Sequence, residues 1–379
     1  MIKRKICWVV VSPLTIHFFL EKHIQALANK YDLTLITNTK DLYFLNHLNV
    51  NIRVLPLAIE RDISIFKDIR ALWDLIAIFH KERFDLVHSL SPKSALLGMV
   101  AAWVTRIPLR VHVFQGEVWA TRSGLWRRFL KFLDKVVVFC STHLLVISRS
   151  EERFLIDEGV VRRGDLTLMA NGSICGVDMA RFKPDVAMRY AIRAQFGIPE
   201  SALLILYVGR LNRDKGLEEL AKAFAQLAQG RSHVHLLAVG PDEGDLRQLM
   251  QSIVGSRERL HFAEYTKSPE HYMAAADILC LPSYREGFGL VLIEAAAAGL
   301  PTVASRIYGI TDAVVDGETG LLFEVKNVED LMTKLLQLLE NAELRKVLGE
   351  KGRQRVAREF SSELVRDFLL SYYERILQK

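Results

Sequence analysis

Cysteine is scarce in this sequence, and its placement excludes two classes of protein. The four cysteines, Cys7, Cys140, Cys175 and Cys280, lie far apart in a chain of 379 residues. No pair has the spacing of zinc ligands, and four dispersed cysteines cannot build the dense framework of a small disulfide-rich secreted domain. We therefore expect reduced, mostly buried thiols and a cytoplasmic protein.

Long hydrophobic segments are also missing. No stretch reaches the ~18–20 uninterrupted apolar residues of a membrane-spanning helix. Three basic residues, Lys3, Arg4 and Lys5, precede an apolar run at 6–11, but the run is short and Pro13 lies just beyond it. Because the sequence after it also lacks a small-residue cleavage site, we interpret this run as a first buried strand rather than as part of a signal peptide.

Neither sign of charge dominates. The chain has 50 basic and 44 acidic residues, a formal net charge of +6, and it is 50% hydrophobic. This excess suits an anionic ligand or membrane surface without requiring either, and we expect no nucleic-acid partner. The sequence contains no internal repeats and no low-complexity segments. Its length exceeds what one hydrophobic core supports, which predicts a globular protein of two domains of roughly 150–200 residues.

Apolar strand candidates alternate with helix candidates through both halves. The strands are expected at 6–11, 33–37, 52–55, 85–89, 111–116, 144–148, 203–208, 234–239, 260–262, 277–283 and 301–305. This alternation predicts an α/β protein with doubly wound parallel sheets, which bind ligands at the carboxyl ends of their strands. We place the domain boundary between Pro184 and Pro199, which gives domains 1–184 and 199–360.

The segment after the strand candidate at 277–283 carries the strongest signal for a ligand. Its small and acidic residues are Glu286, Gly287, Gly289 and Glu294. The glycines allow a ligand to approach the backbone, and the helix that comes next directs free N–H groups at an anion. Two carboxylates would repel a bare phosphate. A sugar nucleotide instead offers its diphosphate to the amides and its hydroxyl groups to the carboxylates.

A second anion site is predicted where the strand candidate at 203–208 ends. Gly209 follows the strand, and Arg210 and Lys215 lie on a loop that opens a helix. Most surface pairs of Arg and Lys bind nothing. At a ligand-facing strand end, however, two cations can pair with a phosphate.

Together these segments resemble the family 4 retaining glycosyltransferases of the GT-B fold. Glu286 and Glu294 stand in the family's E-x7-E arrangement, and residues 209–216 are similar to its G-R-L-x-x-x-K-G diphosphate clamp. The resemblance implies two facing Rossmann-like domains with an interdomain cleft, and a C-terminal helix at 361–379 that packs back on the first domain. It also implies retaining transfer from a nucleotide diphosphate sugar, with UDP expected, without a metal or a cofactor.

The resemblance further implies roles for individual residues. Glu286 faces the donor sugar, Glu294 faces the ribose, and Arg210 and Lys215 neutralise the leaving diphosphate in place of a metal. The donor-binding residues are Gly209, Tyr265, Gly287, Phe288, Gly289, Leu290 and Glu294. No cluster of His, Asp and Glu has metal-ligand spacing, which agrees with a reaction that needs no metal.

In the first half, polar residues at the strand ends predict the acceptor side. Ser12, His88 and Lys93 resemble the cleft-facing positions of the family, although each is also typical of a solvated loop or a helix cap. The family's glycine-rich pair after the first strand is replaced by residues 12–15, as in a branch that acts on lipid-linked acceptors. Gln115 stands before Gly116, where many relatives have a histidine that contacts the reaction centre.

The histidine closest to that position in the sequence is His112, three residues upstream of Gln115. A lone histidine in an apolar strand is more often a buried structural residue than a catalytic one. We therefore predict that Gln115 positions the substrates and that His112 is structural, with the opposite assignment left open.

Residues 119–137 predict an amphipathic helix with two faces. At 100° per residue, apolar side chains fill an arc of about 160° and basic side chains a separate arc of about 100°. The apolar residues are Leu125, Trp126, Phe129, Leu130, Phe132, Leu133, Val136 and Val137, and the basic residues are Arg127, Arg128, Lys131 and Lys135. Two interpretations stay open: a core-facing helix with a solvated basic face, or an element on an anionic membrane surface.

The resulting hypothesis is a glycosyltransferase for a glycan or polyprenyl-diphosphate-linked acceptor in bacterial cell-surface polysaccharide biosynthesis, such as capsule or lipopolysaccharide. Peripheral attachment to the anionic cytoplasmic face of the inner membrane is expected if the helix at 119–137 binds lipid. Two alternatives remain. One is a non-catalytic nucleotide-sugar-binding scaffold, and the other is a nucleotide-sugar epimerase or hydrolase, because a fold does not fix a reaction.

Overall fold

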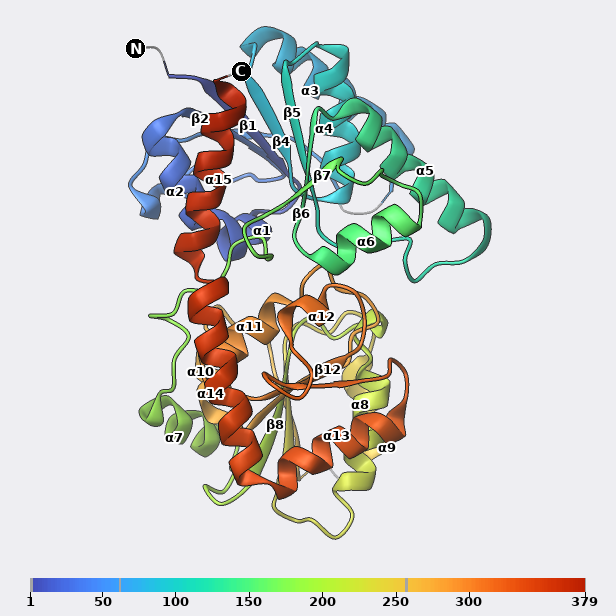
Figure 1. Cartoon of the computed structure of the whole chain (residues 1–379), viewed down its shortest axis with the longest axis vertical. Coiled ribbons are helices and arrows are strands. Elements are labelled where there is room, and N and C mark those ends of the chain that lie inside the picture. Colours follow the sequence, from blue (N-terminus) through green and yellow to red (C-terminus); the bar gives the residue numbers. More distant parts are fainter. Residues whose placement is uncertain (1–2, 61–62, 256–257, 379) are drawn as a thin grey trace. The chain divides into compact units, whose positions relative to one another are not determined.

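The computed structural model describes residues 3–60, 63–255 and 258–378 and divides the chain into two α/β units (Figure 1). The first unit comprises residues 1–175 and 362–379, and the second comprises residues 176–361. Each unit contains one parallel β-sheet, so the predicted fold class is confirmed.

The first unit is built on a seven-stranded sheet with the order β3-β2-β1-β4-β5-β6-β7. Its strands are β1 (Lys5–Val10), β2 (Asp32–Thr37), β3 (Arg53–Pro56), β4 (Leu86–Ser89), β5 (Leu109–Phe114), β6 (His143–Val146) and β7 (Leu166–Leu168). Its helical segments are α1 (Pro13–Thr15), the π-helix η1 (Ile16–Leu20), α2 (Glu21–Lys30), the 3-10 helix η2 (Asn46–Leu48), α3 (Ile65–Glu82), α4 (Pro92–Val104), α5 (Gly124–Cys140), α6 (Arg149–Asp157) and α15 (Ser362–Leu377).

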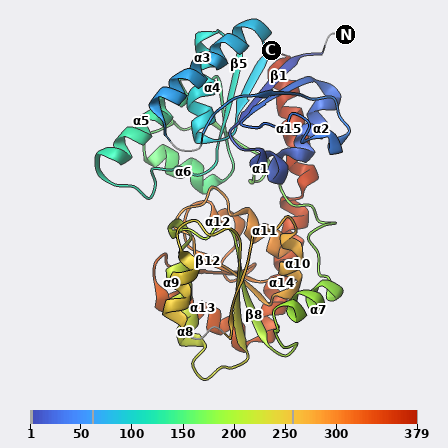
Figure 2. The same ribbon diagram turned by 180° about the vertical axis from the view of Figure 1, so that it is seen from behind.

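Helices cover both faces of this sheet. Figure 2 shows α3, α4 and α5 along one face, while α2 and α15 lie along the other. The central strand β1 is therefore buried on both sides, which explains why its residues from Ile6 to Val10 form one continuous apolar run.

The second unit has a six-stranded parallel sheet with the order β10-β9-β8-β11-β12-β13. Its strands are β8 (Leu203–Val208), β9 (Val234–Val239), β10 (Leu260–Ala263), β11 (Ile278–Leu281), β12 (Thr302–Ser305) and β13 (Leu321–Phe323). Its helices are α7 (Val186–Gln195), the 3-10 helix η3 (Arg213–Lys215), α8 (Leu217–Leu227), α9 (Leu246–Val254), α10 (Pro269–Ala275), α11 (Leu290–Ala297), α12 (Ile310–Ala313), α13 (Val328–Glu340) and α14 (Ala342–Glu359).

The C-terminal helix α15 belongs to the first unit, as the family resemblance implied. Its Tyr373 is fully buried and accepts a hydrogen bond from the indole nitrogen of Trp8 in β1 at 2.9 Å. Lys22 of α2 also donates to Ser362 at the start of α15 at 2.8 Å. These contacts join residues more than 300 positions apart in the sequence.

The boundary between the units lies earlier than the sequence suggested. We expected it between Pro184 and Pro199, but residues 176–198 belong to the second unit. Arg189 and Arg193 of α7 both form ion pairs with Asp277, which directly precedes β11, at 2.9 and 2.7 Å. The arginines thus bind α7 to the second sheet, and the linker ends before this helix.

Helix α5 buries only part of the predicted apolar arc, because Val137 lies in the core while other members of the arc are exposed. Leu125 is 80% exposed and Phe132 is 59% exposed. Arg127 and Lys131 instead turn inward, where both bond Glu158 at 2.7 Å and lie over the ring of Trp119. The helix also begins at Gly124 rather than at residue 119. Among the described helices, none combines the length and apolarity needed to cross a bilayer.

Candidate active site

The second sheet changes winding direction between β8 and β11, which are adjacent but distant in sequence. In an open α/β sheet, ligands bind outside the carboxyl ends of the strands at such a point. The two segments with predicted anion sites, residues 209–216 and 283–290, directly follow these two strands. The topology therefore brings both sequence motifs to one sheet edge.

Close backbone contacts hold the two loops together. Gly216 has φ +65°, and a Cβ atom added there would lie 2.0 Å from the carbonyl oxygen of Pro282, so this approach requires glycine. The amide of Tyr284 donates to the carbonyl of Asp214 at 2.8 Å. At the end of β8, Gly209 continues the sheet by donating to the carbonyl of Val239 at 3.0 Å.

Lys215 and Glu286 meet at this junction. The ammonium group of Lys215 donates to Oε1 of Glu286, and the hydroxyl of Ser283 donates to the same oxygen at 2.7 Å. Both charged side chains are mostly but not fully covered, with exposed fractions of 18% and 17%. The predicted phosphate cation and the predicted sugar carboxylate thus form one ion pair at the loop junction.

Arg210 points to a different carboxylate. Its Nη1 donates to Oε2 of Glu243 at 2.6 Å, and Asn212 donates to the same oxygen at 3.3 Å. The side chain of Arg210 is 38% exposed. Sequence reasoning missed Glu243, because nothing near it in the sequence indicates that the loop after β9 reaches Arg210.

Helix α11 begins next to the same loop with Gly289 at its N-cap, φ +78°. The side chain of Phe288 is buried against Phe360, so a ligand can meet only the backbone of Phe288. Gly309 approaches the carbonyl oxygens of Glu286 and Gly287 so closely that an added Cβ would lie 2.6–2.7 Å from them. The loop that carries the predicted amide donors is therefore supported on both sides.

Glu294, in the second turn of α11, has a carboxyl group with a raised pKa. Burial raises the pKa of its carboxyl group from 4.5 to about 7; the positive charge of Arg181 opposes this shift and the negative charge of Glu270 adds to it. Near neutral pH this side chain can therefore act as either a donor or an acceptor of a hydrogen bond. Tyr265, which follows β10, is 42% exposed at the same end of the sheet.

In the first unit, Gln115 follows β5 and is held by the neighbouring strand. Its Nε2 donates to the carbonyl oxygen of Leu90, directly after β4, at 2.6 Å. The side chain of Gln115 is partly exposed. Gln115 thus connects the two strand ends β4 and β5.

Both histidines singled out in this unit are buried. His88 is fully covered, its Nδ1 bonds the hydroxyl of Tyr373, and burial lowers its pKa to about 3. The prediction that His88 lies on the acceptor side is therefore wrong, because its ring has no path to a ligand at the surface. His112 is also buried, bonds Ser89 at 3.0 Å, and has a pKa lowered to about 4 by burial, as a structural histidine would.

The other two acceptor-side candidates have local partners. Ser12 caps α1 and accepts a hydrogen bond from the amide of Leu14 at 3.2 Å, so the predicted turn at 12–15 is the start of a helix. Lys93 at the start of α4 forms an ion pair with Asp68 of α3 at 2.7 Å, with 13% of its side chain exposed. Neither contact tests whether an acceptor binds there.

Sequence reasoning missed a buried acidic pair beside Gln115. The amide of Gly116 donates to Glu151, which is fully buried, and burial together with the nearby charge of Glu117 raises the pKa of Glu151. Residues 148–151 match a helix-capping pattern, and Ser148 does accept from the Glu151 amide at 3.1 Å. Because helix capping already explains this pattern, the sequence gives no sign that the Glu151 side chain also accepts from Gly116 at the end of β5.

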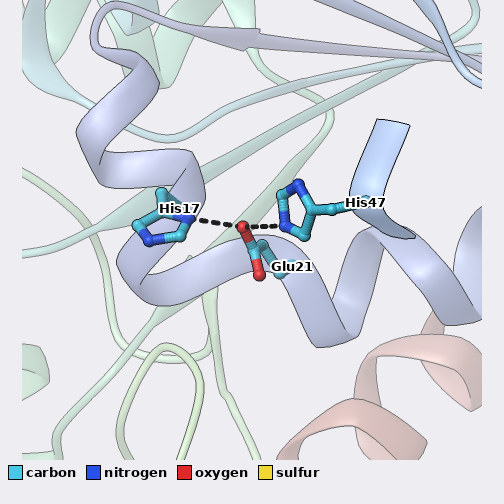
Figure 3. A group of neighbouring side chains, drawn as sticks. All are labelled: His17, Glu21 and His47. Carbon is cyan, nitrogen blue, oxygen red and sulfur yellow. Dashed lines mark hydrogen bonds and ion pairs between the residues drawn. The ribbon is translucent and has the colours of Figure 1, made fainter. Parts of the chain in front are cut away.

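The described residues include one group of possible metal ligands that the sequence analysis did not single out. His17, Glu21 and His47 place one possible ligand atom each within 4.8 Å of one another in the first unit (Figure 3). His17 and Glu21 are four residues apart on a helical segment, a spacing that could have been noticed, but His47 comes from a separate connection.

Comparisons with known proteins agree with this arrangement. Residues 21–172 match the model of a glycosyl transferase 4-like domain, and residues 188–355 match glycosyl transferases group 1. A capsular polysaccharide biosynthesis glycosyltransferase, CapM of Staphylococcus aureus, is 30% identical over 334 residues, which cover 86% of this chain and 85% of the relative.

Two further proteins extend the comparison. The UDP-Gal:alpha-D-GlcNAc-diphosphoundecaprenol alpha-1,3-galactosyltransferase of Escherichia coli is 25% identical over 79% of this chain and 78% of its own length. Anabaena HepE, solved with UDP and glucose, superimposes with a TM-score of 0.81 at 17% identity, over 98% of this chain and 100% of HepE. At that identity, HepE supports the fold alone.

Proposed function

Because the chain belongs to glycosyltransferase family 4 and has the GT-B fold, we propose that it transfers a sugar from a UDP-sugar with retention at the anomeric carbon and without a metal. The observation that carries this proposal is the Lys215–Glu286 ion pair at the switch point of the second sheet. In the proposal, Lys215 of this pair supplies a cation for the phosphate, and Glu286 supplies a carboxylate for the sugar hydroxyls.

The diphosphate would bind where this pair and the start of α11 meet. Lys215 would turn from Glu286 to a phosphate oxygen, and Arg210 would leave Glu243 in the same way. These movements free Glu286 for the donor sugar and keep Glu294 for the ribose. Both cations would then stabilise the negative charge that grows on the leaving diphosphate.

In the proposed reaction the acceptor oxygen forms a bond to the anomeric carbon while the bond from that carbon to the diphosphate oxygen breaks. The proton of the acceptor hydroxyl passes to the leaving phosphate oxygen on the same face of the sugar, which retains the configuration. Such a route requires no protein base. An amide such as Gln115, which cannot take up a proton at neutral pH, is compatible with it.

For the acceptor we propose a polyprenyl-diphosphate-linked glycan in cell-surface polysaccharide biosynthesis. The S. aureus relative is named for capsular polysaccharide biosynthesis, and the E. coli relative is named for transfer to a diphosphoundecaprenol-linked sugar. A lipid-linked acceptor requires the enzyme to reach a membrane, and the first unit has a surface of suitable composition.

We name this the apolar helix surface. It comprises exposed side chains of three neighbouring helices, α3, α4 and α5: Ile65, Phe66, Ile69, Trp73, Trp103, Val104, Leu125, Trp126, Phe129, Phe132 and Phe139. The rings of Trp103 and Phe139 lie 5.8 Å apart and connect α4 to α5. Exposed Arg128 and Lys135 flank the apolar residues of α5, so the surface suits an anionic bilayer at the cytoplasmic face.

The experiment for the reaction is an assay with a panel of nucleotide sugars, with and without a polyprenyl-diphosphate-linked acceptor. We expect product only when acceptor is present, with the donor's anomeric configuration retained. Free sugar from every donor would indicate a hydrolase, and a converted nucleotide sugar would indicate an epimerase. Donor binding without any turnover across the panel would indicate a scaffold.

The membrane assignment is tested by sedimentation with anionic phospholipid vesicles. Replacing Trp126 and Phe132 by Ser, or Arg128 and Lys135 by Gln, is expected to reduce binding, since these residues are exposed. Arg127→Gln is the matched control, because Arg127 is bound to Glu158 and faces inward. Equal sedimentation of all variants and the parent would remove the membrane from the proposal.

A further inference from the structure

His17, Glu21 and His47 form a cluster that the sugar-transfer proposal does not use. His17 lies in the π-helix η1 and Glu21 begins α2, so the two share one face of a continuous helical segment. His47 lies in η2, within the connection from β2 to β3, where the buried residues Leu45 and Leu48 fix it on either side. A π-helix at this position is itself rare and is frequent at functional sites.

The side chains converge on one oxygen atom. Nδ1 of His17 lies 2.6 Å from Oε1 of Glu21, and Nε2 of His47 lies 2.9 Å from the same atom. Figure 3 shows the two rings on opposite sides of the carboxylate, each with one nitrogen directed at it. The exposed fractions of the side chains, 33%, 23% and 50%, leave the cluster open to solvent.

The contacts of the two ring nitrogens of His47 indicate what can lie between this ring and Glu21. Its Nδ1 lies 3.2 Å from the carbonyl oxygen of Phe44. In the tautomer whose Nδ1 donates to this carbonyl, Nε2 of the neutral ring has a free lone pair, because a carbonyl only accepts hydrogen bonds. That lone pair faces a carboxylate oxygen, which is also only an acceptor. The contact therefore requires a cation between the two atoms, either a proton or a metal ion.

We propose that this cluster is a binding site for a divalent transition metal of the Zn²⁺ class. Two imidazoles and one carboxylate are ligands that Zn²⁺ commonly takes, with a remaining position for water. The hydrogen bond from His47 to Phe44 is the kind of outer contact that orients a metal-binding imidazole. Tetrahedral Zn²⁺ needs ligand atoms roughly 3.3 Å apart. The half-exposed His47 ring can move outward to provide this separation.

The bound metal would tie the β2–β3 connection to the segment that follows Ser12 and β1. It would thereby order one loop at the carboxyl edge of the first sheet. This role is independent of the sugar-transfer proposal, because the proposed diphosphate ligands all lie in the second unit. The site is structural or regulatory rather than part of the transfer step.

The test uses the untagged full-length chain, stripped with a chelator and dialysed, then titrated with Co²⁺ and Zn²⁺. We expect about one equivalent of Co²⁺ to give a visible absorption band that Zn²⁺ abolishes. His47→Ala and Glu21→Gln should each weaken Zn²⁺ binding by at least roughly a hundredfold, since loss of even an outer partner costs 10–100-fold. His80→Ala, which removes an exposed histidine of α3, should bind as the parent does.

Two results would overturn the site. Equal affinity in the parent and in both ligand variants would place any bound metal elsewhere. No uptake of Co²⁺ or Zn²⁺ by the parent at a pH where imidazoles are neutral would show that the cluster binds no metal. Circular dichroism of each variant, with melting in the absence of metal, separates loss of a ligand from loss of the fold.

Discussion

The two sheets share their parallel, doubly wound plan, but they use the ends of their strands in opposite ways. In the second sheet, charged side chains gather at the switch point and stay partly exposed, as the Lys215–Glu286 and Arg210–Glu243 pairs show. In the first sheet, the polar residues of the central strand ends are neutral histidines and serines inside the core, such as His88 and His112. A strand end therefore marks where a ligand can bind, while burial decides which side chains can reach it.

The charge pairs of the second sheet are expected to give the largest effects. Lys215→Ala should weaken UDP binding and slow turnover together, by about 1.5–3 kcal/mol or roughly ten- to 150-fold, because one charge-assisted contact is lost. Arg210→Ala should act in the same direction. Lys222→Ala is the control, since this lysine also pairs with a glutamate but on the exposed face of α8. If calorimetry showed unchanged UDP affinity in both variants, these cations would not bind the diphosphate.

The two glutamates of the E-x7-E arrangement should separate binding from turnover. Glu286→Gln is expected to lower kcat with any donor, because the proposal assigns Glu286 to the donor sugar and it pairs with Lys215. Glu294→Gln is expected mainly to weaken binding of free UDP, because its proposed partner is the ribose. Steady-state kinetics give kcat for each variant, and titration with UDP gives its affinity. An equal loss of UDP affinity in both variants would contradict the separate roles of Glu286 in turnover and Glu294 in binding.

Gln115 and His112 test the first sheet. Gln115→Ala should reduce turnover by roughly ten- to a hundredfold, as expected for about 1–3 kcal/mol of lost hydrogen bonding, and should release the carbonyl of Leu90. His112→Ala should chiefly lower the melting temperature, because its ring is buried against Phe114 and bonded to Ser89. Full activity in the Gln115 variant with total loss in a folded His112 variant would reverse the two roles.

Glu294 should make the second unit sensitive to pH. Its folded-state pKa is raised to about 7, so the folded protein holds the proton more tightly than the unfolded chain does. The resulting stabilisation is complete below about pH 4.5 and is lost as the pH rises through about 7. Glu294→Gln should therefore gain stability over the parent between about pH 5 and pH 8, on the order of 1–3 kcal/mol. Melting curves of the parent and the variant at pH 5 and pH 8 measure this gain. A stability difference between the two proteins that is the same at both pH values would contradict the raised pKa of Glu294.

Chelation should have the smallest effect on turnover. With Arg210 and Lys215 as the charge-neutralising groups, EDTA is expected to change the transfer rate by less than about twofold. A complete loss that added metal restores would contradict metal-free transfer. Any metal bound by His17, Glu21 and His47 should appear instead as a change in the melting temperature, which makes the two metal questions separable.

Helix α5 shows what hydrophobic periodicity can and cannot predict. The spacing of its apolar residues correctly indicated a two-faced helix, but the arc alone could not tell which face neighbouring elements cover. Glu158 and Trp119 attract Arg127 and Lys131 inward. Leu125, Trp126, Phe129 and Phe132 are left exposed, whereas Val137 at the other end of the helix is buried in the core. The same limit applies to Glu151, whose capping pattern is local while its contact with Gly116 is not.

The sequence by itself determined the alternation of strands and helices, both parallel sheets, and the two motifs that follow β8 and β11. These features depend on local hydrophobic periodicity, on glycines at turns and on short charge patterns, all of which are written in neighbouring residues. Tertiary structure alone decided that Tyr373 covers His88, that Lys215 meets Glu286, and that His47 reaches Glu21. Each of these contacts joins segments that are separated in sequence, and its formation depends on how whole elements pack, which no local pattern encodes.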